Sequence, residues 1–322
     1  MPVDEVISTA QPHPTPLAEV TPIVGANAKA QATPQRRARR QRWIRFGVTH
    51  LALLLICAGF ILPLGWMIST SLKTNREAML FPPKILPNPP NFDSYPQVLK
   101  HPRVDFPLFA RNTVVVAGLA VIGTTFASAF VAYGFAKVRF RGRGVLFGMM
   151  LSTMMIPFPV IMISQFLLFR WLDLHTPIQF LGTFKPLWLP WWFGTAFNIF
   201  LLRQFFMTIP DELSEAARID GCGDVGIFFR IMLPLARPAL ACVALFTFMH
   251  HWNDFLGPLI YLQDPQQYTL ALGLQQLQGT QGTTTEWNVL MAGSVLVVLP
   301  VIVLFFLTQR TFIQGIATTG LK

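Results

Sequence analysis

The chain has 322 residues, of which 52% are hydrophobic and only 12% are charged, whereas soluble domains carry about 25% charged residues. This composition excludes an ordinary soluble enzyme and favours a protein that crosses a membrane several times. The net charge of +10 points to no nucleic-acid partner until the charges are placed along the chain. The three cysteines are far apart in sequence, so neither a disulfide framework nor a C-x-x-C metal site is predicted.

Residues 1–45 have the composition of a tail that precedes the membrane domain. Residues 1–34 contain six prolines among small and polar residues, and such a segment buries too little apolar surface to order itself. A cluster of six arginines follows between Arg36 and Arg45, directly before a hydrophobic run. That position predicts a cytosolic segment in contact with membrane lipid, rather than a nucleic-acid arm. The hydrophobic run is too long for a cleaved signal peptide.

Six hydrophobic segments predict an all-α integral membrane protein with six transmembrane helices within residues 46–322. The first has 23 residues without Lys, Arg, Asp or Glu, and its helical length of about 35 Å exceeds a hydrocarbon core of about 30 Å. Pro157 and Pro159 interrupt the third segment, which is tolerated where a neighbouring helix or a cavity satisfies the freed carbonyls. The predicted spans are 46–68, 112–136, 145–169, 186–206, 238–261 and 287–309.

The distribution of basic residues predicts the orientation. With both termini in the cytosol, 17 Lys and Arg residues lie on the inner side and 8 on the outer side. This agrees with the excess of basic residues in cytosolic loops of membrane proteins. The sequence therefore predicts a multi-pass protein of a prokaryotic cell membrane, with a polar loop at about 207–237 in the cytosol.

That loop carries the signals of two short helices. Asp211 is a candidate N-cap because its carboxylate can accept from the free N–H groups of a first helical turn. Gly221 suits the left-handed residue that ends a helix. A second helix is predicted from Asp224 to about Leu233, where Pro234 would stop it.

The same loop resembles the EAA loop of binding-protein-dependent ABC transporter permeases. The family pattern has E-A-A, then D-G, then I-x-L-P, and Cys222 stands here where the family usually has alanine. The resemblance implies a type I ABC importer permease fold and a role in coupling to an ATPase for the matching residues. These are Glu215, Ala216, Ala217, Asp220, Gly221, Ile231, Leu233 and Pro234.

The resemblance also implies the partners. They are a second, MalF-like permease subunit, two cytosolic P-loop ATPase subunits that bind ATP and Mg, and an extracytoplasmic sugar-binding protein. The C-terminal tail, from Gln314 to Lys322, would contact the ATPase as well. The chain itself has no G-x-x-x-x-G-K-[ST] sequence, so we expect no ATPase activity and no cofactor of its own.

A second informative stretch runs from His250 to Phe255 in the fifth predicted span. Trp252 offers a flat face for a sugar ring, while Asn253 and Asp254 offer hydrogen bonds to hydroxyl groups. An acidic residue within a span normally faces a bundle interior or a cavity. Alternatively, Asp254 lies at the outer end of the span and anchors a loop. A shared metal ion at His250 and His251 is disfavoured because adjacent helical residues point about 100° apart.

The W-N-D-F sequence in this stretch is similar to the carbohydrate-importing, MalG-like branch of these permeases, and the resemblance covers about residues 45–322. It leaves the solute open among oligosaccharides, monosaccharides and glycerol-3-phosphate. Trp188, Trp191 and Trp192 fit an interfacial belt better than a cavity.

Two alternatives stay open within transport. A permease for a polyol or glycerol-phosphate would need an Arg or Lys in its cavity, and the spans contain almost none. An ion-coupled secondary transporter would show carboxylates within its spans and an internal repeat. Asp254 is the one candidate carboxylate, and no repeat is evident.

Overall fold

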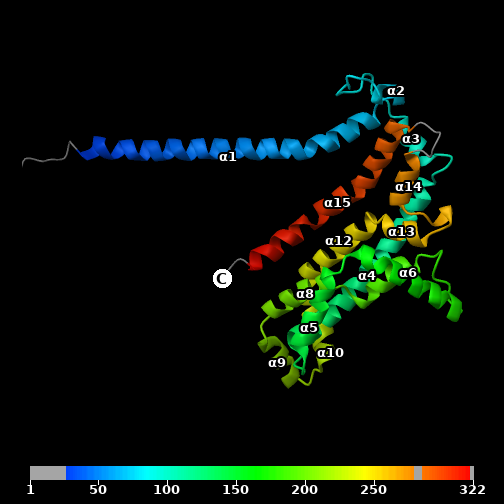
Figure 1. The fold of residues 1–322 in the computed structure, drawn as a ribbon. Coiled ribbons are helices and arrows are strands. Elements are labelled where there is room, and N and C mark those ends of the chain that lie inside the picture. The colour runs from blue at the N-terminus through cyan, green and yellow to red at the C-terminus, as the bar shows by residue number, and fades with distance from the viewer. Residues whose placement is uncertain (1–26, 279–284, 320–322) are drawn as a thin grey trace, which may run out of the picture. The chain divides into compact units, whose positions relative to one another are not determined.

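The computed structural model describes residues 27–278 and 285–319, and every regular element within these ranges is a helix. The chain divides into two compact units, 1–63 and 64–322. The predicted disorder of residues 1–26 falls outside the described part. The long helices of the second unit and the short ones at its two ends can be followed in Figure 1.

Helix α1 (Asn27–Ser71) begins earlier than the sequence predicted. Residues 27–34 were expected to be disordered and are helical, which corrects that part of the prediction. Alternate residues there are alanine, the strongest helix former, and the helix continues into the apolar span. The part from Arg42 to Ser71 is long and apolar enough to cross a membrane, and none of its most apolar window is buried against the rest of the protein.

The second unit holds two long helices, α4 and α15, and many shorter ones. The helices of its first half are α2 (Asn75–Ala78), α3 (Ser94–Leu99), α4 (Phe106–Lys137), α5 (Arg143–Ser152), η1 (Thr153–Met155), α6 (Phe158–His175), α7 (Lys185–Trp188), η2 (Leu189–Phe193) and α8 (Ala196–Thr208). Those of its second half are α9 (Glu212–Ile219), α10 (Asp224–Ile227), η3 (Phe228–Met232), α11 (Leu233–Leu235), α12 (Arg237–Trp252), α13 (Leu256–Tyr261), η4 (Pro265–Gln267), α14 (Leu270–Leu277) and α15 (Trp287–Thr319).

Helix α4 is the element on which the second unit is packed. Small side chains on α4, among them Ala120 and Ser128, are fully buried, and α8, α12 and η2 lie against it. A Cβ atom at Gly123 would lie 1.9 Å from Cδ1 of Trp192, whose indole N–H donates to the carbonyl of Leu119 at 2.9 Å. Close approach of this kind is how helices associate in lipid, where no hydrophobic drive brings them together.

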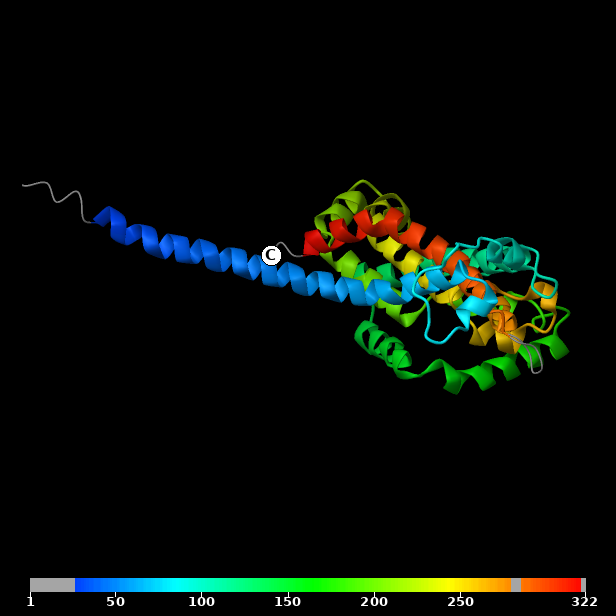
Figure 2. The ribbon, with the colours of Figure 1, turned by 90° about the horizontal axis from the view of Figure 1, so that it is seen from above.

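Within the described ranges, three helices are long and apolar enough to span a membrane, or up to five if each of two bent pairs counts as one span. The three are Arg42–Ser71, Phe106–Lys137 and Trp287–Gln309, which contain the first, second and sixth predicted spans. A count of six therefore remains a prediction. In Figure 2 the bent pair α5–α6 runs along the side of the second unit opposite α15.

The third predicted span is interrupted at its prolines, as the sequence indicated. The fourth and fifth predicted spans are interrupted as well, which corrects the expectation of continuous helices there. The third bends by 100° beside Pro157, which lies in extended conformation between η1 and α6. The fourth is helical as α8 only from Ala196, because Gly194 has a φ of +81° and breaks the run. The fifth stops at Trp252 and resumes at Leu256.

Candidate functional site

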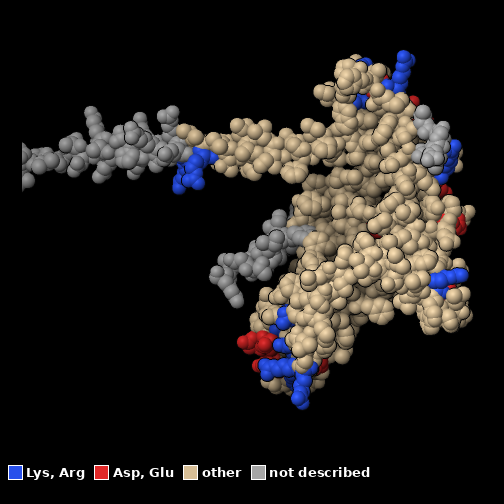
Figure 3. Space-filling view, viewed as in Figure 1, with Lys and Arg blue, Asp and Glu red and all other residues tan. Residues whose placement is uncertain are grey.

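Charged side chains gather at two ends of the second unit. Figure 3 shows them near α9 and α10 and along the opposite edge, from α2 and α3 to the end of α6, with an almost uncharged band between. Such a band matches the apolar core of a membrane, and the α9 end carries the predicted coupling loop.

The first helix of that loop, α9, is held at its start by a lysine. Asp211 was expected to cap the helix, but its backbone is helical and its carboxylate makes no capping hydrogen bond. Instead Oδ1 of Asp211 accepts from Nζ of Lys137 at 2.6 Å, and the same ammonium donates to the carbonyl of Ile209 at 2.6 Å. The carboxylate binds this ammonium rather than the helix N–H groups, since the ammonium adds the attraction of a full positive charge.

Lys137 is the last residue of α4, so this contact ties the loop to the central helix. Its side chain is 6% exposed, whereas that of Asp211 is 67% exposed. The hydrogen bond from Lys137 and its positive charge lower the pKa of the Asp211 carboxyl. Loss of this contact would affect Lys137 more than Asp211, because the buried ammonium needs acceptors within the protein.

Helix α9 has one buried and one exposed face. Ser214 and Ala217 are buried against the rest of the unit, while Glu215, Ala216 and Asp220 are exposed. Ile219, one turn after Glu215, is 86% exposed on the same face. Of the E-A-A triplet, the second alanine therefore packs inward while the glutamate and the first alanine point outward.

The turn after α9 is fixed by its backbone. Gly221 has a φ of +81°, and its N–H donates to the carbonyl of Arg218 at 3.0 Å. The N–H of Cys222 donates to the carbonyl of Ala217 at 2.9 Å, and Arg218 forms an ion pair with Asp224 at 2.9 Å. The structure thus has glycine in the left-handed conformation predicted for it.

The second half of the loop is one continuous helical segment rather than a helix stopped by Pro234. Asp224 does begin α10, but a π-helical turn, η3, leads into α11, with Pro234 in its first turn. Proline is tolerated there because no N–H is needed at that position. Ile231 and Leu233 are half-buried and Pro234 is exposed. The chain then turns by 79° into α12.

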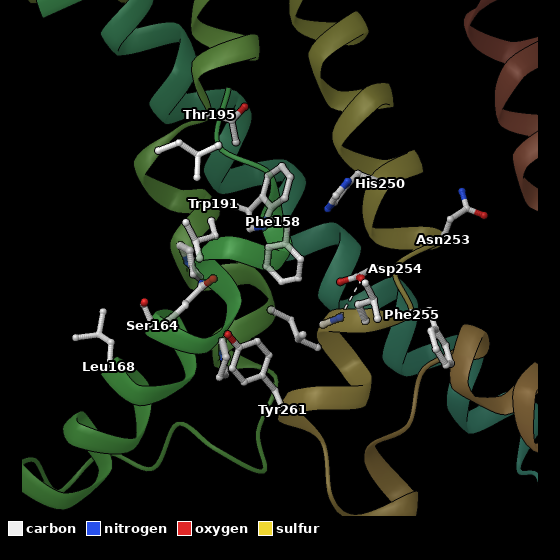
Figure 4. Close-up of a pocket in the computed structure, with 18 of the residues that line it drawn as sticks. Phe158, Ser164, Leu168, Trp191, Thr195, His250, Asn253, Asp254, Phe255 and Tyr261 are labelled. Atoms are coloured by element: carbon white, nitrogen blue, oxygen red, sulfur yellow. Dashed lines mark hydrogen bonds between the residues drawn. The ribbon is translucent and has the colours of Figure 1, made fainter. Parts of the chain in front are cut away.

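A cavity of about 1020 Å³ lies at the three breaks described above. Ile156 and Phe158 line it from the break before α6, Thr195 from the break before α8, and residues 253–257 from the break between α12 and α13. Figure 4 shows side chains from these segments converging on one space. Non-helical backbone at membrane depth is tolerated where it lines a cavity. The position of the three breaks around this cavity agrees with that rule.

The cavity combines aromatic surface with a few polar groups. Asp254 lines it, and its Oδ1 accepts from the N–H of Gly257 at 3.1 Å. The ring centroids of Trp191 and His250 are 4.5 Å apart, and both residues line the cavity, as does Tyr261. The lining residues include no Lys and no Arg. No group of three or more His, Cys, Asp and Glu in the described part of the chain could hold a metal ion.

The three residues predicted to contact a solute have different surroundings in the structure. Trp252 is 4% exposed, stacks on Phe248 and donates its indole N–H to the carbonyl of Val297 at 3.0 Å, so its position favours a packing role. Asn253 lines the cavity, although its amide group donates to the carbonyl of Met249 at 2.8 Å. Asp254 lines it, and its carboxylate also binds the backbone at the start of α13, so both interpretations of this residue stay open.

Trp191 is the cavity residue that sequence reasoning placed elsewhere. It was expected in an interfacial belt with Trp188 and Trp192, yet it lines the cavity. Trp192 instead packs against α4. The available signal was Pro190 and Gly194 on either side of Trp191, because an interrupted helix in a span points to a cavity.

Comparison with known proteins gives a consistent result. Residues 121–318 match the family described as binding-protein-dependent transport system inner membrane component. The arabinooligosaccharides transport system permease protein AraQ of Bacillus subtilis (strain 168) is 31% identical over 288 residues, which cover 86% of this chain and 98% of the relative. The sn-glycerol-3-phosphate transport system permease protein UgpE of Yersinia pestis bv. Antiqua (strain Antiqua) is 35% identical over 211 residues, 66% of this chain and 73% of the relative.

Solved structures are similar as well. A chain of a bacterial ABC transporter involved in the import of the acidic polysaccharide alginate superposes with a TM-score of 0.73 at 25% identity, covering 84% of this chain and 97% of that one. A bacterial alginate ABC transporter in complex with its alginate pentasaccharide-bound periplasmic protein has a TM-score of 0.63 at 16% identity, with 85% and 95% covered. The second likeness concerns the fold alone.

The contact of Lys137 with the loop generates a prediction. Lys137→Met removes both bonds to the loop, so we expect the amides of α9 to exchange hydrogen severalfold faster in hydrogen–deuterium exchange measured by mass spectrometry. Asp211→Asn should have a smaller effect, because Lys137 still donates to Ile209. Arg139→Met, which removes an exposed cation nearby, is the matched control.

The same contact predicts the direction of a pH effect. The pKa of the Asp211 carboxyl is lowered in the folded protein. Its ion pair with Lys137 is therefore fully formed above the ordinary pKa of about 3.9, and it is lost as pH falls through the lower pKa of the folded protein. Exchange in α9 that is the same in Lys137→Met and the unaltered protein would contradict this account.

Proposed function

We propose that this chain, which belongs to the family of binding-protein-dependent transport system inner membrane components, imports an uncharged carbohydrate and is driven through its α9–α11 loop by a separate ATPase. Membership makes it a membrane permease component of an ABC importer. The proposal adds the coupling surface, the partners, the orientation and the class of solute. The single observation that carries the solute class is the aromatic cavity with Asp254 and without a basic side chain.

The geometry of the loop supports the coupling role. Glu215 and Asp220 are exposed carboxylates beside the exposed Ile219, so a partner with an apolar, basic cleft could hold α9. The buried contact of Lys137 with the loop would pass a force on α9 to the central helix. ATP and Mg would be bound by two such ATPase subunits, while this chain has no P-loop sequence.

The remaining partners follow from the class of transporter. A second permease subunit would complete the pathway, as the resemblance to ABC importer permeases implies. An extracytoplasmic binding protein would deliver the solute at the α2–α3 end. This arrangement needs six spans with both termini in the cytosol, which the count of basic residues supports.

The chemistry of the cavity favours a carbohydrate. Sugar rings present apolar faces to aromatic rings such as Trp191, and their hydroxyl groups donate to carboxylates such as Asp254. A phosphate or a uronate would need a cation to offset its charge and would be repelled by Asp254. The glycerol-phosphate alternative and an acidic polysaccharide are thus both disfavoured, although relatives named for such solutes share the fold.

Mild detergent purification of the chain from its native membrane tests the class of assembly. We expect a P-loop ATPase, a second multi-span permease and a secreted binding protein to co-purify, and Glu215→Lys to weaken retention of the ATPase because it reverses a charge on the exposed face of α9. Recovery of the chain alone or as a homo-oligomer would contradict the proposal and direct attention to ion-driven transport.

The turn after α9 gives a matched pair of variants. Gly221→Val places a β-branched residue at a φ of +81°, a conformation that costs on the order of 1–3 kcal/mol for such a side chain. We expect it to abolish solute-stimulated ATP hydrolysis by the reconstituted complex while membrane insertion stays normal. Gly223→Ala has an ordinary φ of −74° and open space around the new methyl group, so it should be near normal. Equal activity of the two variants would exclude the predicted role of the turn.

Asp254 gives a test of the cavity that leaves its backbone contact in place. In Asp254→Asn the amide oxygen can still accept from Gly257, but the charge is lost. Since a hydrogen bond to a charged group contributes about 1.5–3 kcal/mol, we expect uptake to need roughly 10- to 100-fold more solute. Asp93→Asn, at an exposed position outside the cavity, is the control. Unchanged uptake by Asp254→Asn would remove this residue from the solute pathway.

A further inference from the structure

An exposed apolar loop follows the end of α1. Between α2 and α3, Phe81 is 95% exposed, Ile85 74% and Leu86 75%. Three exposed apolar residues in one short segment form a hydrophobic surface that is unfavourable in contact with water. Neither the EAA loop nor the cavity accounts for them.

The loop is held beside the last turn of the span. Ser69 donates its hydroxyl hydrogen to the carbonyl of Ile85, and the N–H of Asn91 donates to the carbonyl of Leu72 at 2.8 Å. Ser69 precedes the end of α1 by two residues, which is about 3 Å along a helix axis. Ile85 therefore lies level with the end of the apolar helix and not out in the water beyond it.

A buried lysine fixes this arrangement. Lys73 is 2% exposed, its Nζ donates to the carbonyl of Lys84 at 2.5 Å, and the same Nζ lies 4.5 Å from the centroid of the Trp66 ring. The ammonium thus connects the loop to an aromatic residue of the last turns of α1. Tryptophan and lysine at the end of a span are typical of the boundary between acyl chains and headgroups.

The composition of the loop fits the same boundary. Pro82, Pro83 and Pro87 carry no backbone N–H, which reduces the number of donors that need a partner near acyl chains. The side chain of Lys84 is exposed beside the apolar residues, where it can reach lipid phosphate.

We propose that residues 79–86, with Lys73 as their clamp, are a lipid-binding anchor that inserts Phe81, Ile85 and Leu86 into the leaflet at the Ser71 end of α1. In the orientation proposed above this is the outer leaflet. The lipid surface is favoured over a protein partner because the loop continues the exposed apolar surface of α1 at the same depth. The anchor would thus set the depth in the membrane of the loop that connects α1 with the rest of the permease.

Spin labelling of the complete transporter in nanodiscs of phosphatidylethanolamine and phosphatidylglycerol tests the anchor. Cys57, Cys222 and Cys242 are first replaced by serine, and one cysteine is then introduced by Phe81→Cys or Ile85→Cys. Leu62→Cys is the control for lipid, since Leu62 is 69% exposed on α1, and Lys100→Cys is the control for water, since Lys100 is exposed just after α3.

At positions 81 and 85 we expect relaxation by oxygen to exceed relaxation by a water-soluble nickel chelate severalfold, as at position 62. A nickel response equal to that at position 100 would overturn the proposal in favour of a solvent-exposed loop. Weak relaxation by both reagents would overturn it in favour of a protein partner.

The clamp is tested by adding Lys73→Met to the label at position 81. The nickel response there should rise severalfold while the response at position 62 stays constant, because loss of the ammonium frees the loop without altering the span. An unchanged response would show that Lys73 does not hold the anchor.

Discussion

Every backbone N–H and C=O group inside a membrane must find a partner within the protein, and this constraint organises the structure. Helix α4 satisfies it as one unbroken helix of 32 residues. The segments around it do not, since the runs ending in α6, α8 and α13 are each interrupted. All three interruptions border one cavity. Polar backbone is thereby concentrated where water or a solute can satisfy it.

The same helix supplies the means of packing. Its buried small residues allow α8 and α12 to lie close on two sides, and Gly123 leaves room for the indole of Trp192. Because η2 is fixed to α4 in this way, the neighbouring Trp191 has a defined place in the cavity wall. The residues around Gly123 therefore determine both the close helix packing and the shape of the candidate site.

Sequence reasoning predicted the features that depend on local chemistry. The left-handed Gly221, the start of a helix at Asp224 and the uninterrupted second and sixth spans follow from residue type and hydrophobic length. It failed where a distant residue decides the outcome. Lys137 takes the carboxylate of Asp211 from its expected capping role, and Val297 takes the indole N–H of Trp252. Neither partner lies within 40 residues of the group it binds, so no local pattern could reveal the pairing.

Two buried ammonium groups perform the same task at the two ends of the second unit. Lys73 follows α1 and binds the carbonyl of Lys84, while Lys137 ends α4 and binds the carbonyl of Ile209. A lysine at a helix end has a long apolar stem that packs against the helix and a charged tip that reaches a loop carbonyl. Each therefore fixes a loop to a helix end.

A single helix, α12, connects the coupling loop to the cavity. Helix α12 begins two residues after α11 and ends at Trp252, with His250 in the cavity wall. Its 16 residues extend about 24 Å. A displacement of the α9–α11 loop would reach the cavity along this one helix, while Lys137 holds the start of α9 to α4. Because α12 ends at the break before Asp254, a small rotation of the helix would move that carboxylate relative to Trp191. The interruption that creates the cavity is thus also the joint at which a movement of the loop would change its shape.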